Sequence, residues 1–170
     1  MGAGEKETRR IRLVVDTNIV FSALITPGRT NQVLLKARGS FYAPMELLEE
    51  LKDKRGKIAR LLGMDESVVM DLIEAFAGEI VSFVPLHEFL DTIPRARRIA
   101  GEFDEKDTPF IALAMHLNIP LWTGDKGLLR FSARTGFKYF VAVDTEGVEL
   151  LLRGEPLGSV LERMRGKYLK

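Results

Sequence analysis

Short apolar runs that end at turns constrain the fold of this chain more than any other feature of its sequence. Residues 11–16 read "IRLVVD" and residues 41–44 read "FYAP". Three further runs are "VSFVP" at 81–85, "PLWTGD" at 120–125 and "FKYFVAV" at 137–143. Short, strongly apolar runs between turn signals are typical of strands that are covered on both faces of a sheet. We therefore expect a buried β-sheet.

The stretches between these runs have the periodicity of amphipathic helices. Residues 45–63 space their leucines and isoleucine helically, and Asp65 is placed to cap a second helix at 65–80. The segment at 104–119 carries Pro109 where the first turn of a helix tolerates it. Strands that alternate with helices favour a parallel sheet between helical layers. The sequence predicts an α/β fold, a three-layer α/β/α sandwich with a short, mostly parallel central sheet.

The length of 170 residues suits one domain with a sizeable core. We expect a flexible charged tail at 1–10, the main domain at 11–147, and a C-terminal helical extension of the same domain at 148–170. No apolar run approaches the ~20 residues that cross a bilayer, so we expect no membrane contact. The N-terminus lacks the apolar segment of a secretory signal. The sequence thus predicts a cytoplasmic protein.

Composition limits the chemistry that the chain can perform. Cysteine is absent and only two histidines occur, which excludes zinc–thiolate sites, cysteine nucleophiles and histidine-rich metal sites. A divalent ion would have to be held by carboxylates, which favours Mg²⁺ or Mn²⁺. The net charge of +1 does not imply a nucleic-acid partner, so such a site must rest on local basic clusters.

Two aspartates stand directly at the ends of predicted strands. Asp16 ends the first apolar run and Asp125 ends the fourth. Ligands of open parallel sheets bind at the carboxyl ends of the strands, so both carboxylates would share one edge of the sheet. Each also has a structural interpretation, because Asp16 could cap the following helix and Asp125 could be a turn residue.

Further acids lie at the ends of other predicted elements. Asp104 and Asp107 are three residues apart, a spacing that puts both carboxylates on one side of a helix or of the turn leading into it. Their mutual repulsion would raise a pKa or require a cation between them. Glu46, Glu49 and Glu50 lie on one amphipathic helix, where we expect at least two to be only solvated.

These acids fall within motifs that resemble those of PIN-domain nucleases. The resemblance is carried by "VVDTNIVFSAL" at 14–24, "APMELLEELKDK" at 43–54 and "DEKDTPFIALAMHLNIPLWTGDKGLL" at 104–129, in this order and spacing. It covers roughly residues 11–145, and the segment after it matches less clearly. The last motif is the most specific, since it joins an aspartate before an "ALA" helix to a strand ending in "TGD".

The resemblance implies a catalytic carboxylate set that holds Mg²⁺ or Mn²⁺. Position by position, Asp16 matches the first metal-site aspartate of the family, Glu50 the helix glutamate, Asp107 the third acid and Asp125 the fourth. Asp104 fits a further metal-site acid found in part of the family. Glu46 and Glu49 stay alternatives for the second acid, because Pro44 and Met45 stand where many relatives have a serine.

The resemblance also implies contacts to substrate. Asn18 and Thr123 match small polar residues that line the site, and Lys126 is the best-placed basic residue because it adjoins Asp125. Further basic side chains that could contact phosphates are Arg130, Arg95, Arg97 and Arg98.

The implied activity is metal-dependent endonucleolytic cleavage of single-stranded RNA. Many chains of this kind are VapC-like toxins that an antitoxin protein blocks, and homodimers are common among them. The alternative is a non-catalytic PIN-like module that binds RNA or a partner protein. A haloacid-dehalogenase-type phosphohydrolase would need an acid two residues after Asp16, where Asn18 stands. A receiver domain would need an acidic pair ahead of the first strand's aspartate, and only the glutamates of the tail precede it.

Overall fold

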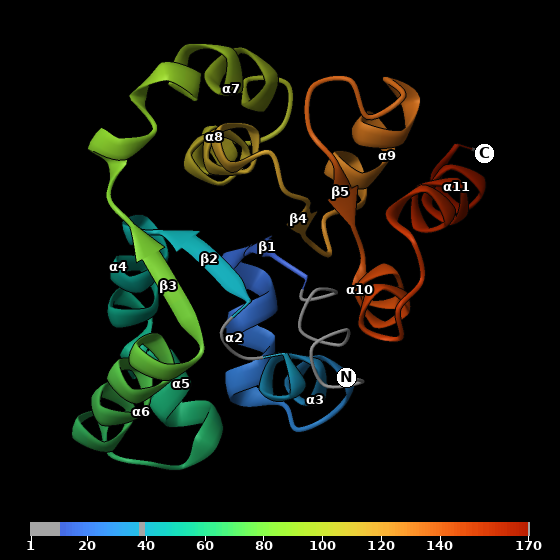
Figure 1. Ribbon diagram of the computed structural model, residues 1–170. Helices are drawn as coiled ribbons and strands as arrows, with labels where there is room; N and C mark the ends of the chain where they lie inside the picture. The colour runs from blue at the N-terminus through green and yellow to red at the C-terminus, as the bar shows by residue number, and fades with distance from the viewer. Residues whose placement is uncertain (1–10, 38–39, 170) are drawn as a thin grey trace, which may run out of the picture.

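The protein contains one five-stranded sheet in which every strand runs parallel to its neighbours, in the order β3-β2-β1-β4-β5. The structure is a computed structural model and describes residues 11–37 and 40–169, so the predicted tail at 1–10 lies outside the described residues. Helices cover both faces of the sheet (Figure 1), which confirms the predicted α/β sandwich. The strands are β1 Leu13–Val15, β2 Phe41–Pro44, β3 Val81–Val84, β4 Leu121–Trp122 and β5 Ala142–Val143.

Each face of the sheet has its own set of helices. On the upper side in Figure 1, α8 packs against β1, β2 and β4, α7 lies on α8, and α9 packs against β5. The bounds on this side are α7 Ile93–Ala100, α8 Thr108–Leu117 and α9 Lys126–Arg134, with short 3-10 turns η1 Leu86–Glu88, η2 Leu90–Thr92 and η3 Glu105–Asp107. On the lower side lie α2 Thr17–Ile25, α3 Arg29–Lys36, α4 Met45–Asp53, α5 Arg55–Leu62, α6 Glu66–Glu79 and α10 Thr145–Leu152.

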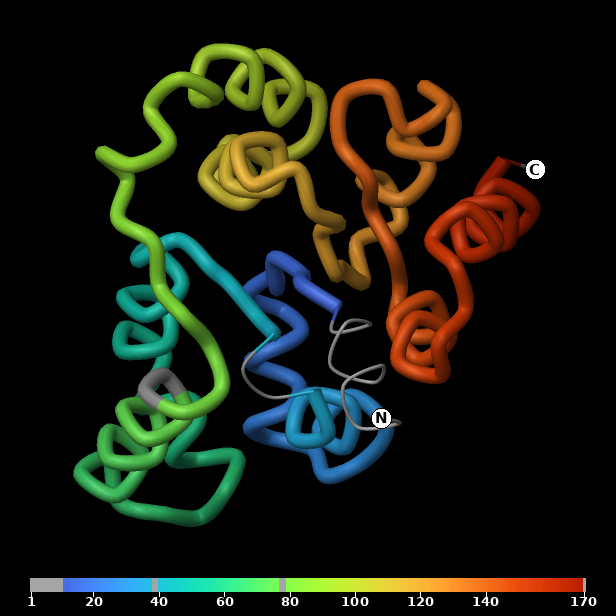
Figure 2. The backbone as a smooth tube through the Cα atoms, in the orientation of Figure 1, coloured from blue at the N-terminus to red at the C-terminus, as the bar shows by residue number. Residues whose placement is uncertain are grey.

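The chain reverses its winding between β1 and β4. From β1 it proceeds outward through β2 to β3, and α7 and α8 then return it across the sheet to β4, on the other side of β1. The tube in Figure 2 can be followed along this path. The segments after β1 and β4 therefore leave toward opposite faces, which opens a crevice at the carboxyl ends of these two strands.

The centre of the sheet is dry and closely packed. All three residues of β1 and both residues of β4 are fully buried. Trp122 packs against Phe41 with ring centroids 5.7 Å apart, and its indole N–H donates to the Thr145 hydroxyl at 3.2 Å. The hydrogen bond to Thr145 therefore satisfies the indole N–H, which is usual for a buried tryptophan.

Two predicted elements differ from the structure. The helix expected over 45–63 is two helices, because Lys54 leaves the helical region with φ −92° and ψ 7° and separates α4 from α5. The strand expected over 137–143 is only β5. Phe137 adopts a positive φ of 61°, and the Ser132 hydroxyl donates to the Phe140 carbonyl and accepts from the Ala142 N–H. These side-chain hydrogen bonds satisfy backbone groups that a longer strand would have paired.

The predicted cap of the helix after residue 64 is also only partly present. Asp65 occupies the N-cap position of α6 with an extended backbone, but its side chain makes no capping hydrogen bond.

The C-terminal helix α11, Leu157–Tyr168, is fastened to the sheet by a buried carboxylate. Asp144 follows β5, is 8% exposed, and accepts from the Gly147 N–H at 2.9 Å, the Lys167 ammonium at 2.6 Å and the Tyr168 hydroxyl at 2.6 Å. Burial alone would raise the pKa of Asp144, but the hydrogen bonds from Lys167, Tyr168 and Gly147 outweigh it and lower that pKa. The helix also packs along α9 and α10.

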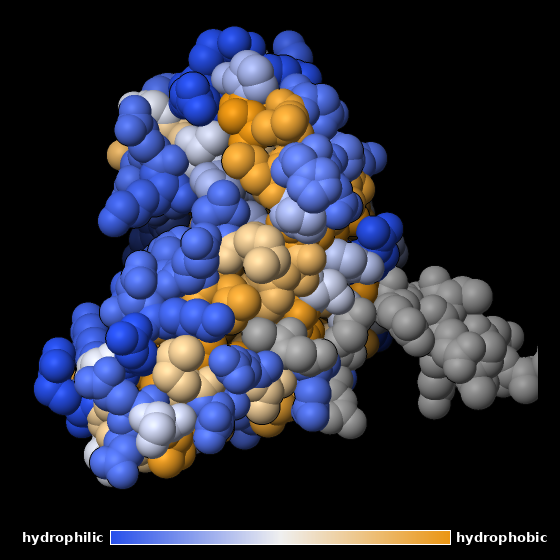
Figure 3. Space-filling model, turned by 90° about the vertical axis from the view of Figure 1, so that its left-hand side faces the viewer, coloured by the Kyte–Doolittle hydropathy of each residue, from blue (hydrophilic) through white to orange (hydrophobic). Residues whose placement is uncertain are grey.

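The surface beside β3 mixes polar and apolar side chains. Figure 3 looks onto this side and shows hydrophobic patches separated by hydrophilic residues. Among the exposed apolar side chains are Leu61, Met64, Val68 and Leu72 of the α5–α6 region. Within the described ranges, no helix combines the length and the apolar character that crossing a bilayer demands.

The Asp144 contacts predict a pH-dependent stabilisation. Tyr168→Phe should lower the free energy of unfolding by about 1 kcal/mol at pH 7, because it removes one hydrogen bond to a charged acceptor. Because folding lowers the pKa of Asp144, its ionised form stabilises the fold at any pH above its pKa in the unfolded chain. This stabilisation is lost as pH falls through the pKa of Asp144 in the folded protein. The difference between variant and wild type should therefore shrink in acid. Urea unfolding at pH 7 and pH 3 measures it, with Tyr139→Phe as the matched control.

Candidate metal centre

Asp16 lies at the carboxyl end of the central strand β1 and is 7% exposed. Its backbone N–H donates to the Trp122 carbonyl at 3.1 Å, which extends the β1–β4 pairing by one residue. The position of the carboxylate is therefore set by the sheet itself. Burial raises the pKa of Asp16, against hydrogen bonds from Thr123 and from the N–H groups of Thr17 and Asn18 that lower it.

Thr123 connects the two strand-end aspartates. Its hydroxyl donates to Asp16 Oδ2 at 2.7 Å and accepts from the Asp125 N–H at 3.0 Å. Asp125 in turn caps α9, since its Oδ1 accepts from the N–H groups of Gly127 at 2.8 Å and Leu128 at 3.2 Å. Both aspartates stand beside the same hydroxyl, and the charge of Asp125 contributes to raising the pKa of Asp16.

The second acid of the predicted set comes from α4, on the lower side of the sheet. Glu50 on α4 accepts a hydrogen bond from the Thr17 hydroxyl at 3.3 Å, and its pKa is raised by burial. Of the alternatives for this acid, Glu49 is exposed and Glu46 lines a neighbouring cavity beside Thr108. The structure therefore places Glu50 next to Asp16.

Asp107 is the most perturbed acid of the group. It directly precedes α8, and one of its carboxylate oxygens, Oδ2, is buried with no hydrogen-bond partner among the described residues. Burial and then the charges of Asp16, Asp125, Asp104 and Glu50 together raise the pKa of Asp107 to about 7. Four other carboxylates thus act on this one group. Unscreened repulsion of this kind is relieved either by a proton or by a cation.

Asp16, Glu50 and Asp107 line a cavity of about 360 Å³ at the switch point of the sheet, whereas Asp125 is not among its lining residues. Asp104 lines it and also accepts from the Lys106 N–H at 3.0 Å. Lys54 and Lys106 are the cations of its wall, and both lower the pKa of Glu50. The residues that line the cavity are Asp16, Thr17, Asn18, Glu50, Asp53, Lys54, Asp104, Lys106, Asp107 and Phe110.

The donor set fits a hard divalent cation. Every acidic donor is a carboxylate oxygen, which suits Mg²⁺ or Mn²⁺, and the unpartnered Oδ2 of Asp107 is a ligand atom with no competing hydrogen bond. Within the part of the chain that the structure describes, no three acidic or histidine side chains are already gathered closely enough to hold a metal. Carboxylate rotation would therefore be needed to complete a coordination shell.

The predicted substrate residues differ in their surroundings. Asn18 is exposed on the cavity wall, whereas Thr123 is fully buried and positions Asp16 and Asp125. Lys126 is exposed at the start of α9, outside the residues that line the cavity.

The sequence interpretation missed Thr17 and Lys106. Thr17 directly follows Asp16, and a hydroxyl residue next to a strand-end aspartate could have indicated that it contacts another acid of the site. Lys106 lies between the two acids of "DEKD".

Comparison with known proteins agrees with this geometry. The PIN domain family model matches residues 14–152, so the chain belongs to the PIN-domain family, whose members are generally metal-dependent nucleases. The chain is also similar to the uncharacterized protein MJ1680 of Methanocaldococcus jannaschii. The two are 30% identical over 139 residues, which cover 78% of this chain and 81% of the relative.

The capping role of Asp125 predicts different effects for two substitutions. Asp125→Ala should destabilise the fold by about 1 kcal/mol, because it removes the side-chain acceptor at the N-cap of α9. Asp125→Asn should cost much less, since asparagine caps helices about as well as aspartate. Chemical denaturation of both variants without metal tests this. Equal losses would show that the negative charge, rather than the cap, sets the stability.

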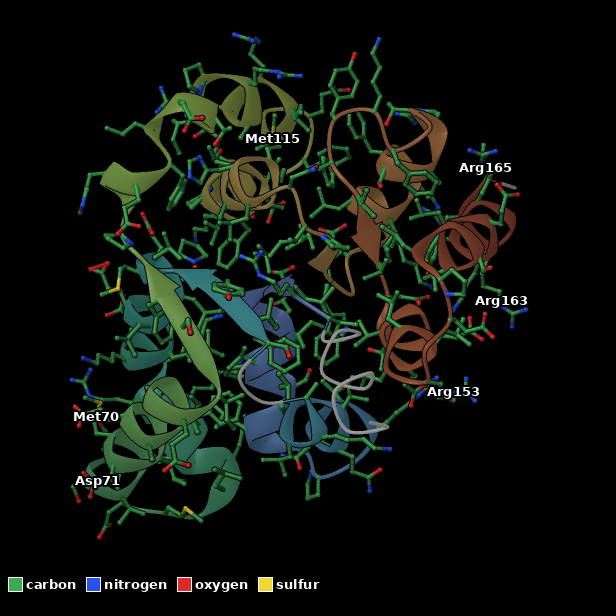
Figure 4. The ribbon with its side chains drawn as sticks, in the orientation of Figure 1. Met70, Asp71, Met115, Arg153, Arg163 and Arg165 are labelled. Carbon is green, nitrogen blue, oxygen red and sulfur yellow. The ribbon has the colours of Figure 1, made fainter. Side chains whose placement is uncertain are left out.

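The raised pKa of Asp107 predicts that stability falls with increasing pH when no metal is present. The unfolded chain releases this proton at about pH 4, whereas the folded protein keeps it up to about pH 7. The contribution of the protonated Asp107 carboxyl group to stability is therefore full below about pH 4 and is lost as pH rises through about 7. Melting temperatures in EDTA between pH 5 and 8 should fall for wild type and change less for Asp107→Asn. Asp71→Asn, an exposed acid on α6, is the control (Figure 4).

Proposed function

We propose that this protein is a Mg²⁺- or Mn²⁺-dependent endoribonuclease that hydrolyses phosphodiester bonds of single-stranded RNA. The observation that carries the proposal is the buried, unpartnered oxygen of Asp107 among mutually repelling carboxylates at the switch point of the sheet. A stabilising role alone does not account for acids that raise one another's pKa. Membership of a family of nucleases supports the assignment of the chemistry.

In this proposal Asp16, Asp107 and Asp125 are the principal metal ligands, directly or through water. Asp104 and Glu50 complete the metal site or bind a second ion. When bound, the metal would lower the pKa of a water molecule and compensate the charge of the scissile phosphate. The chain itself fixes Asp16 by the β1–β4 pairing and by the Thr123 hydroxyl.

The remaining polar residues of the cavity would act on the substrate. Asn18 is exposed on the cavity wall and can donate its amide N–H groups to a phosphate oxygen. Lys54 and Lys106 offset part of the negative charge that an RNA backbone would meet there. Lys126 is exposed at the start of α9 and would contact a phosphate that extends beyond the cavity.

The finer biological role rests on the resemblance alone. A VapC-like toxin activity, an antitoxin partner and a homodimer all stay predictions. A cytoplasmic location stays a prediction from the sequence pattern. RNA rather than DNA as substrate also derives from the family resemblance.

The proposal predicts that Asp16→Asn abolishes cleavage without unfolding the protein. Loss of one metal-ligand charge should reduce the rate of single-stranded RNA cleavage in Mn²⁺ by at least about 100-fold. The fold should survive, because burial already disfavours the charged form of this carboxyl group. Cleavage of a labelled RNA is measured with Mn²⁺, with Mg²⁺ and with EDTA, and Asp71→Asn serves as the control.

The same assay separates the enzyme from a non-catalytic PIN-like module. Thermal unfolding with and without Mn²⁺ reports metal binding independently of turnover, because a ligand that binds only the folded state raises its stability. Metal-dependent stabilisation that Asp16→Asn removes, without any cleavage by wild type, would favour the non-catalytic alternative. Undiminished cleavage by Asp16→Asn would overturn the metal-site assignment.

A further inference from the structure

A second groove lies between α7 and the region that joins α9 to β5. Its volume is about 360 Å³, and it is lined by Arg95, Arg98, Ile99 and Glu102 on one side and by Phe131, Thr135 and Tyr139 on the other. Both walls lie on the upper side of the sheet in Figure 1. None of these residues lines the carboxylate cavity. We call this feature the α7–α9 groove.

The charge of the α7–α9 groove is predominantly positive. Arg95 and Arg98 are three residues apart on α7, so they project from one face of that helix, and both are exposed. Neither forms an ion pair with any residue that the structure describes. Lys138 and Arg134 add two cations next to the aromatic wall, and Glu102 is the single acid among the lining residues.

The opposite wall offers an aromatic surface. Tyr139 is 38% exposed, and its ring packs against Phe131 with centroids 6.1 Å apart. Phe131 is itself fixed by Phe103 at 5.6 Å and Phe140 at 5.9 Å. Tyr139 is therefore a partly exposed ring on a rigid aromatic base, which suits stacking of a planar group.

The two elements that form the groove also lead to the metal centre. Glu102 in the groove is followed by Phe103 and then by Asp104, which lines the carboxylate cavity. On the other wall, Phe131 lies six residues after Asp125 on α9, about 9 Å along the helix. A linear ligand of a few units could thus occupy the groove and reach the carboxylate cavity.

We propose that the α7–α9 groove binds the single-stranded RNA substrate beside the cleavage site, a proposal that rests on the proposed nuclease function. Arg95 and Arg98 contact consecutive phosphates, and Tyr139 stacks on a base. Cations that follow a backbone, together with an exposed aromatic ring, form the common arrangement for binding single strands without strict sequence preference.

An acidic protein segment is the competing ligand for a cationic groove. It would satisfy the arginines but would leave the stacking surface of Tyr139 unused. The groove also approaches the carboxylate cavity through the segment from Glu102 to Asp104, and this favours the substrate over a separate partner. The contribution of Tyr139 therefore distinguishes the two ligands.

The test is the affinity for a labelled single-stranded RNA of about 12 nucleotides, measured by fluorescence anisotropy in EDTA over a salt series. Arg95→Ala/Arg98→Ala should weaken binding at least tenfold at low salt. It should also reduce the slope of log K against log salt by about 1.4, because each phosphate contact on a single strand contributes about 0.7. Tyr139→Ala should weaken binding about tenfold, whereas Tyr139→Phe should bind like wild type.

The matched control is Arg60→Ala/Arg153→Ala, which removes the same charge from α5 and from the end of α10. Both arginines are exposed, and Arg153 projects outward on the side away from α7 (Figure 4). The control should keep the wild-type salt slope. Equal losses in both double variants would overturn the groove as a specific site. Competition by polyglutamate as effective as by unlabelled RNA, with no effect of Tyr139→Ala, would assign the groove to an acidic protein segment instead.

Cleavage kinetics keep this inference separate from the proposed function. If wild type cleaves the RNA, the arginine double variant should raise KM about tenfold and leave kcat within about twofold, as loss of uniform binding requires. Unchanged KM and unchanged affinity would refute the groove while the nuclease assignment stands. Groove-dependent binding without cleavage by wild type would refute the nuclease assignment while the groove stands as an RNA-binding site.

Discussion

The pairing of β1 with β4 is the interaction on which the rest of the site depends. It brings together two segments that are more than a hundred residues apart, and it continues one residue beyond β1 through the bond from the Asp16 N–H to the Trp122 carbonyl. The Thr123 hydroxyl then joins Asp16 to the backbone of Asp125. Since β1 is also the strand where the winding reverses, these fixed groups face an open crevice instead of a covering helix.

Gathering acids at this crevice opposes folding. The charges of Asp16, Asp125, Asp104 and Glu50 all act on Asp107, whose buried Oδ2 makes no hydrogen bond to any residue that the structure describes. The fully buried strands β1 and β4 supply hydrophobic stabilisation immediately beneath this cluster. The fold therefore tolerates an unfavourable arrangement at one edge, as proteins commonly do where local rules are broken for function.

Periodicity and run length were sufficient to predict the architecture and the edge where the strand-end acids lie. The apolar runs contain the strands, and the rule for parallel sheets predicts that Asp16 and Asp125 lie at the same edge. The break at Lys54 was not predictable from periodicity, because a one-residue interruption hardly disturbs the helical spacing of the leucines. The shortness of β5 was not predictable either, because it depends on hydrogen bonds from the Ser132 side chain to the backbone of Phe140 and Ala142.

The contacts of individual side chains could be predicted from the sequence even less well than the helices and strands. The separate roles of Thr17 and Thr123 depend on which rotamer each hydroxyl adopts against a neighbour that is distant in sequence. The α7–α9 groove was likewise hidden, because Arg98 and Tyr139 are brought to one surface only by the return of the chain across the sheet. Residue type identified these groups as polar, basic or aromatic, and tertiary structure alone assigned their neighbours.

Asp16 and Asp144 each directly follow a strand of the sheet, yet the two carboxylates have different partners. Asp144 receives an ammonium group from its own chain, delivered by the last turn of α11. Asp16 accepts a hydrogen bond from the Thr123 hydroxyl and forms no ion pair with any of the described residues. Asp144 thus links α11 to the sheet, whereas no positively charged side chain pairs with Asp16 in the described part of the chain. In the proposed function, a divalent cation from solution would supply the positive charge that the chain does not place beside Asp16.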